Sequence, residues 1–143
     1  MLSFSIAETE VREFMNKLLR EDVFDSFEAR GVEISSFARF EIDGVSGESC
    51  CSWGEMRPYV FNIIKGRRPK AFKIVLSLPV EQARALHENA AAYFLNFMFD
   101  GGEILCTAAA AEKSFSLDRA AEGAWQEFVT EFFKSKQITT RRN

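Results

Sequence analysis

The chain has 143 residues, a net charge of −3 at neutral pH and 47% hydrophobic residues, among them 15 Phe. A chain of this length suits one domain, and folding can bury about two-thirds of its surface. The small net charge excludes a global field that would attract nucleic acid or a membrane, and no run of about 18 apolar residues is present to span a bilayer. We therefore expect a single domain over residues 1–143.

The first half of the chain alternates between strand and helix patterns. Apolar residues recur at helical spacing between residues 11 and 19, which predicts an amphipathic helix. Ser52 and Glu55 have the spacing of a capping box, so a helix begins at Trp53, or nearer Arg57 if Pro58 cannot lie inside it. The expected elements are strands at 2–6, 23–34 (bulged at Gly31) and 38–42, and helices at 11–19 and about 53–64.

The second half shows the same order of patterns. Pro79 suits the first turn of a short helix, and Asp118 can cap the last helix. The sequence Asp100-Gly101-Gly102 predicts a hairpin turn between two strands. The expected elements are strands at 72–78, 93–99 and 104–109, and helices at 80–90 and about 118–136.

The two halves match each other at a fixed offset. Trp53 aligns with Trp125, and the phrases Phe40-Glu41-Ile42-Asp43 and Phe115-Ser116-Leu117-Asp118 precede them. Such self-similarity predicts an α+β fold made by fused internal duplication of a β-α-β-β-α unit about a pseudo-twofold axis. Amphipathic sequences also align with themselves by chance, which is the alternative. The expected architecture has about six mainly antiparallel strands and four helices, in halves of about 1–66 and 70–136 with a frayed tail at 137–143.

The predicted strand at 93–99 is apolar on both faces, which is typical of a strand that is buried on both sides. Helices on both faces of the sheet, or a curled sheet, would bury it without a partner. If all the helices cover one face, the other face needs a cover from a second copy or another protein. The candidate interface residues are then Val75, Phe94, Met98 and Leu105.

Basic residues gather after the second helix of each half, in the segments 65–73 and 134–142. Such clusters attract a nucleotide, a nucleic acid or another anion, although cations at a helix C-terminus also interact with its dipole and need no ligand. The chain has no glycine-rich phosphate loop, and nucleic acid is the least expected of these ligands. The candidate anion-binding residues are Lys65, Arg67, Arg68, Lys70, Lys134 and Lys136.

No residue pattern predicts catalysis, a metal site or a cofactor. His87 is the only histidine, and we expect it to be structural. Cys50, Cys51 and Cys106 lack the C-x-x-C spacing of zinc sites, and their odd number makes a poor disulfide framework. These features favour inert thiols in a reducing, cytoplasmic setting, with a Cys50–Cys51 redox pair as the alternative.

Several short motifs are spread over nearly the whole chain. They are Phe14–Leu19, Phe24-Asp25-x-Phe27, Phe40-x-Ile42-Asp43-Gly44, Ile64-Lys65-Gly66 with Pro69, Phe72-Lys73, and Phe115-x-Leu117-Asp118 with Trp125. Together they resemble a family of short, uncharacterised clostridial proteins, a domain of unknown function. The resemblance implies a small bacterial protein and carries over no activity, cofactor or catalytic residue. The alanine run at 108–111 departs from the polar strand end usual in that family.

These patterns favour a non-enzymatic cytoplasmic protein-interaction module, in its simplest form a homodimer. The alternative is a protein that binds an anionic ligand through the segments 65–73 and 134–142. An enzyme that uses His87 or the vicinal cysteines is the least favoured hypothesis.

Overall fold

The computed structural model describes residues 2–65 and 69–143, which form a seven-stranded antiparallel sheet, four α-helices and a small separate hairpin. The strands of the sheet are β1 (Leu2–Ile6), β2 (Glu28–Ser35), β3 (Arg39–Asp43), β6 (Ala71–Ser77), β7 (Ala90–Phe99), β8 (Ile104–Glu112) and β9 (Arg141–Arg142). The α-helices are α1 (Val11–Leu19), α2 (Trp53–Ile64), α3 (Val80–Leu86) and α4 (Ala120–Ser135). A 3₁₀ turn, η1 (Glu8–Glu10), leads into α1, and β4 (Val45–Ser46) pairs with β5 (Ser49–Cys50) in the hairpin. The predicted α+β class is confirmed.

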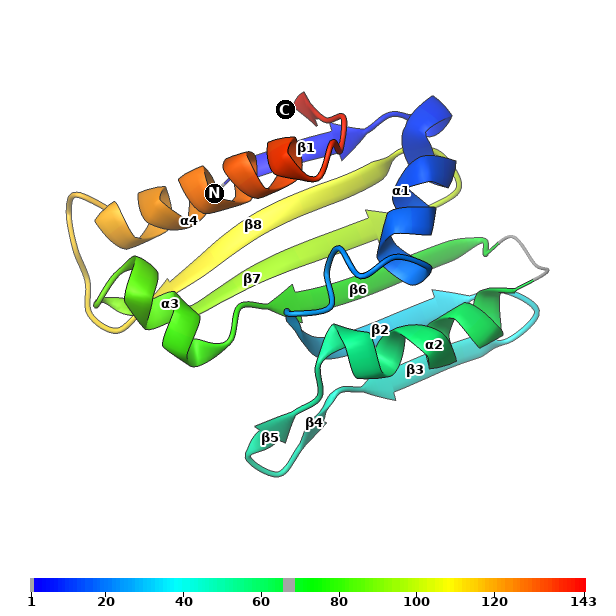
Figure 1. Ribbon diagram of the computed structural model, residues 1–143, viewed down its shortest axis with the longest axis horizontal. Coiled ribbons are helices and arrows are strands. Elements are labelled where there is room, and N and C mark those ends of the chain that lie inside the picture. Colours follow the sequence, from blue (N-terminus) through cyan, green and yellow to red (C-terminus); the bar gives the residue numbers. More distant parts are fainter. Residues whose placement is uncertain (1, 66–68) are drawn as a thin grey trace.

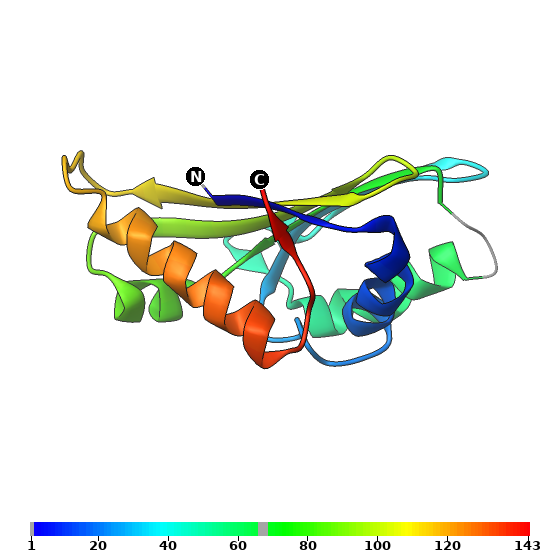
Figure 2. The same cartoon turned by 90° about the horizontal axis from the view of Figure 1, so that it is seen from above.

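The strands lie in the order β3-β2-β6-β7-β8-β1-β9, and the six predicted strands are all present (Figure 1). Figure 2 shows that the four helices of the described residues lie against one face of this sheet. The molecule therefore has two layers, one of helices and one of strands. The alternative of helices on both faces was wrong, and the opposite face of the sheet, which we name the outer face, carries no helix from the described chain.

The order of the elements repeats, but the strand pairing does not. β1-α1-β2-β3-α2 is followed by β6-α3-β7-β8-α4, as the duplication predicts. However, β6 pairs with β7, whereas β1 pairs with β8 instead of β2. The matching phrases also diverge, because Phe40 lies on β3 while Phe115 and Leu117 lie in a loop and are 87% and 90% exposed. The pairing does not follow a pseudo-twofold axis, and the duplication itself stays a prediction.

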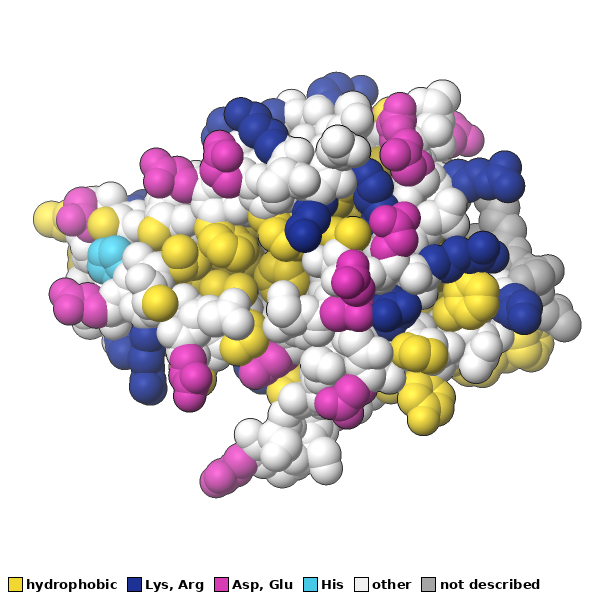
Figure 3. All heavy atoms as spheres, in the orientation of Figure 1, with side chains coloured by type: hydrophobic (Ala, Val, Ile, Leu, Met, Phe, Trp, Pro, Cys, Tyr) yellow, Lys and Arg dark blue, Asp and Glu magenta, His cyan; other side chains and the backbone are white. Residues whose placement is uncertain are grey.

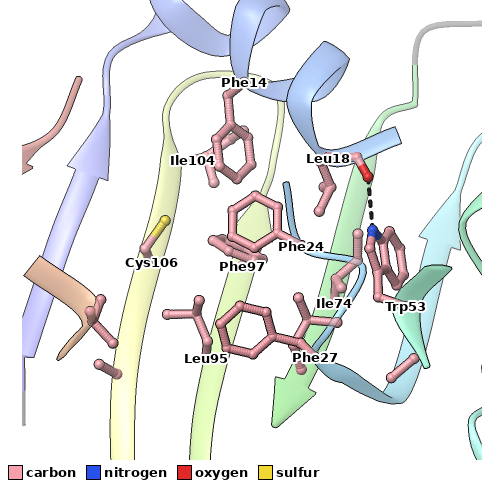
Figure 4. Packing of buried hydrophobic residues seen from close by; sticks show 14 of the residues in the cluster. Phe14, Leu18, Phe24, Phe27, Trp53, Ile74, Leu95, Phe97, Ile104 and Cys106 are labelled. Atoms are coloured by element: carbon pink, nitrogen blue, oxygen red, sulfur yellow. Dashed lines mark hydrogen bonds between the residues drawn. The ribbon is translucent and has the colours of Figure 1, made fainter. Parts of the chain in front are cut away.

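Helix α2 begins at Trp53, so the alternative start near Arg57 was wrong. The Ser52 side chain accepts a hydrogen bond from the Glu55 backbone N–H at 3.2 Å, which is the cap that the sequence predicts. Trp53 is fully buried, and its indole N–H donates to the Leu18 carbonyl at 2.8 Å (Figure 4). The cap and this buried anchor outweigh the one backbone hydrogen bond that Pro58, inside the helix, cannot donate.

Strand β2 begins at Glu28, later than the predicted start at residue 23. The residues before it form a turn that inserts Phe24 into the core between the helices and the sheet (Figure 4). The ring of Phe24 lies 5.9 Å from that of Phe14 and 5.4 Å from that of Phe97. Asp25, in the same turn, accepts two hydrogen bonds from Arg57 at 2.8 and 2.7 Å. A contact with α2 therefore holds this segment out of the strand.

The C-terminal residues 137–143 are exposed except for Ile138 but are held to the fold by hydrogen bonds, so the expectation of a frayed tail was wrong. Ile138 is buried, and β9 pairs with β1. The Lys17 ammonium donates hydrogen bonds to the carbonyl oxygens of Lys136 and Gln137 at 2.9 and 2.7 Å. The polar composition of the tail gave no sign of this contact, because its partner lies on α1 at the other end of the chain.

We expect Lys17→Met to lower the free energy of unfolding by about 2 kcal/mol. The variant keeps the buried aliphatic stem and removes two hydrogen bonds from a charged donor, which contribute roughly 1.5–3 kcal/mol when one partner is lost. Urea denaturation followed by circular dichroism measures the change. Lys134→Met, at an exposed position of α4, is the control and should change stability by less than about 0.5 kcal/mol. Equal stability of the two variants would contradict a stabilising role for the hydrogen bonds from Lys17 to the C-terminal residues.

Candidate functional site

The outer face brings together the four predicted interface residues. They lie on the three neighbouring strands β6, β7 and β8. Met98 is paired directly with Leu105, while Val75 is opposite Asn96 and Phe94 is opposite Ala109. Because side chains alternate across a strand, all four point away from the helices. Val75, Phe94, Met98 and Leu105 therefore form an apolar patch near the centre of the outer face. The patch is interrupted by Asn96 and Thr107 and bordered by Lys73, which is paired with Met98.

This apolar patch is accessible to solvent. Met98 is 49% exposed and Leu105 40%, whereas the neighbouring Phe97 on the helix side is fully buried. Phe94 and Val75 are half-buried by their neighbours on the sheet. The two apolar faces of β7 therefore have different environments. One face packs against helices, and the other has no cover within the described residues.

A hollow lies beside the apolar patch, where Gly31 of β2 leaves room between β3 and β6. It has a volume of about 420 Å³ and is lined on its rim by Glu33, Glu41, Asp43 and Lys73. A Cβ atom added at Gly31 would meet only the Ile42 carbonyl oxygen, at 3.8 Å, so the space over this residue is open. The outer face thus presents exposed apolar side chains next to a hollow that is lined by charged side chains.

The described residues of the two predicted anion-binding segments lie at separate places on the surface. Lys65 follows α2 and lines a cavity beside α1, whereas Lys134 lines a separate hollow over β1. The Lys136 ammonium lies 5.8 Å from the centre of the Phe132 ring, and Lys70 precedes β6. Arg67 and Arg68 lie outside the described residues. Lys65 and Lys134, one from each segment, therefore line different parts of the surface.

The histidine and the cysteines have local structural contacts. The His87 Nδ1 accepts a hydrogen bond from the Asn89 backbone N–H at 3.0 Å, in the turn after α3. The three cysteines are free thiols, and burial raises the pKa of each. A raised pKa lowers the thiolate fraction at neutral pH and with it the reactivity of the thiol. Within residues 2–65 and 69–143, no three His, Cys, Asp or Glu side chains gather as a metal site would need.

Sequence reasoning missed two arginines that line the same cavity as Lys65. Arg12 and Arg20 lie two helical turns apart on α1 and its C-cap, with Asn16 between them. Positions four residues apart share one face of a helix, so the spacing i, i+4, i+8 was the available signal. It was not informative alone, because most such stripes simply face solvent.

In the part of the chain that the structure describes, none of the helices is long and apolar enough to cross a bilayer. The chain matches none of the curated proteins and none of the solved structures with which it was compared. One family model matches residues 17–140. The chain therefore belongs to the family of unknown function DUF5721.

Proposed function

We propose that this protein is a non-enzymatic, cytoplasmic interaction module that forms a homodimer through its outer face. The observation that carries the proposal is the apolar patch on a sheet face without helices, where Met98 is 49% exposed. Exposed apolar patches of this kind commonly mark protein interfaces. The three free thiols support a reducing, cytoplasmic location.

The size of the outer face suits a second copy of the chain. Strands lie about 4.8 Å apart and rise about 3.3 Å per residue, so the five strands β2, β6, β7, β8 and β1 span a flat area of roughly 600 Å². A stable interface buries about 800 Å² of accessible surface on each partner. Two outer faces packed against each other at an inter-sheet angle of about 30° would therefore reach the lower end of the standard size range, about 1,200 Å² in total.

The shape of the outer face favours a self-complementary dimer. β6 lies between β2 and β7, so a twofold axis along β6 would bring β7 of one copy over β2 of the other. Asn96 is level with Gly31 and Met98 with Glu33, so Met98 of each copy would lie over the Glu33 side of the hollow in its partner. A C2 interface makes each such contact twice, which doubles its contribution to the free energy of association.

We expect Met98→Glu to weaken self-association by at least about 100-fold. Two carboxylates, one from each copy, would lose hydration in the interface, a cost that the neighbouring Lys73 of each chain would offset only in part. Sedimentation equilibrium measures the dissociation constant directly. Val80→Glu is a matched control, because Val80 is also 49% exposed but lies on α3, in the helix layer. Loss of the dimer in both variants, or in neither, would contradict the assignment of the outer face.

A further inference from the structure

A cavity of about 490 Å³ lies on the helix side of the molecule, between α1, α2 and one end of the sheet. This volume is in the range of small-molecule sites, about 300–1,000 Å³. Figure 3 shows Lys and Arg side chains beside hydrophobic ones near this end of the helix layer. The cavity is separate from the outer face, since it opens between the helices.

The interior of the cavity is apolar. Phe72 of β6 and Phe99 of β7 stack at its floor with their ring centres 5.3 Å apart, and both are buried. Met15 and Leu19 of α1 form one wall and Ile64 of α2 contributes to the other. Such a lining favours an alkyl or aromatic group, because each buried CH₂ stabilises binding by about 0.8 kcal/mol.

The mouth of the cavity is positively charged. Arg12, Arg20 and Lys65 line it, against a single acid, Glu8. Among the residues that the structure describes, no ion pair within 4.0 Å involves these three cations. This concentration of unpaired positive charge contrasts with the net charge of −3 of the whole chain.

One of the cations is held in position at the mouth. The Arg20 guanidinium lies over the Phe61 ring, 5.2 Å from its centre. This cation–π contact uses none of the guanidinium N–H donors, which remain available for a carboxylate or phosphate. Arg20 is therefore oriented before any ligand arrives, which lowers the entropic cost of binding.

We propose that this cavity binds a small amphipathic anion, with an alkyl or aromatic body on the Phe72–Phe99 floor and an anionic head at the cationic mouth. Arg20 and Lys65 both adjoin Phe61 and would contact the head, while Arg12, about 12 Å away along α1, adds to the positive field. The apolar interior and the cationic mouth match the two parts of such a molecule. Carboxylate and phosphate heads share the chemistry that these cations recognise, so the experiment below compares both. The inference is independent of the homodimer.

Isothermal titration calorimetry with decanoate, decyl phosphate and decanol tests the ligand class. The three probes share one alkyl chain and differ only in the head. We expect both anions to bind at least about tenfold more tightly than decanol, because charge-assisted hydrogen bonds to arginine are lost with the neutral head. The tighter of the two anions identifies the natural head as carboxylate or phosphate. Equal affinity for decanol and the anions, or no binding of either anion, would overturn the proposal.

Variants locate the binding. The double variant Arg12→Gln/Arg20→Gln should weaken decanoate binding at least about tenfold and leave decanol unchanged. Its control, Arg84→Gln/Lys113→Gln, removes the same charge at exposed positions outside the cavity and should bind as the wild type does. Asn16→Trp, at an exposed position of the cavity lining, should block all three probes. Binding that survives both the double variant and Asn16→Trp would place the site elsewhere and refute the proposal.

The same titration on Met98→Glu separates the cavity from the dimer. Met98 lies on the outer face and does not line the cavity. We expect decanoate to bind this variant with wild-type affinity. Loss of binding in Met98→Glu would show that the site needs the dimer and would contradict a cavity that is complete within one chain.

Discussion

Trp53→Ala is expected to lower the free energy of unfolding by about 3–5 kcal/mol, the largest effect of any single side chain on α2. Trp53 is fully buried and its indole N–H donates to the Leu18 carbonyl at 2.8 Å. The substitution leaves a large cavity and an unpaired buried carbonyl at α1. Because a domain of this size has a stability of only about 5–15 kcal/mol, the variant should be close to unfolding at 37 °C.

Urea denaturation separates the two contributions. Trp53→Phe keeps most of the aromatic volume and removes the N–H donor, so it should be intermediate in stability. Tyr59→Ala, on the same helix but 71% exposed, is the control and should cost less than about 1 kcal/mol. A loss of stability for Trp53→Ala no greater than that for Tyr59→Ala would contradict the role of Trp53 as the anchor between α1 and α2.

Gly44→Ala is expected to destabilise the protein by at least about 3 kcal/mol or to prevent folding. An added Cβ would lie 1.7 Å from the Ala29 carbonyl oxygen, and backbone cannot move aside as a flexible side chain can. Gly44 is fixed there by two backbone hydrogen bonds, from its N–H to the Arg30 carbonyl and from the Cys51 N–H to its own carbonyl, both 3.0 Å. The methyl group would therefore force β2 away from the segment that leads into α2.

Gly123→Ala provides a control of opposite sign. Gly123 lies inside α4, and an added Cβ would meet no atom within 4 Å. Alanine has a higher helix propensity than glycine, so this variant should be more stable by up to about 1 kcal/mol. Thermal denaturation of the two variants side by side gives the comparison. A Gly44→Ala protein that melts at the wild-type temperature would show that the close approach at Ala29 is relaxed in solution.

Periodicity predicted the elements whose formation depends on their own residues. The helical stripe at 11–19 and the alternating strand at 72–78 are each decided by one buried face, and the strand at 93–99 by its continuous apolar run. The turn at Phe24 and the packed tail at Ile138 were missed because distant side chains, Arg57 and Lys17, hold them. Such contacts leave no local pattern in the sequence.

The candidate sites show the same division. The outward residues Phe94 and Met98 follow from alternation along β7, but whether helices cover them depends on how the elements pack. The hollow at Gly31 requires the pairing of β2 with both β3 and β6, and the cavity requires α1 to lie beside α2. Neither pairing can be deduced from spacing alone, because strand order is a property of the whole fold.

The solution mass of the wild-type protein, measured by light scattering behind size-exclusion chromatography, tests the homodimer most directly. We expect a particle of twice the chain mass of 16.3 kDa, stable on dilution to micromolar concentrations. A mass of 16.3 kDa at every concentration would contradict a dimer through the outer face.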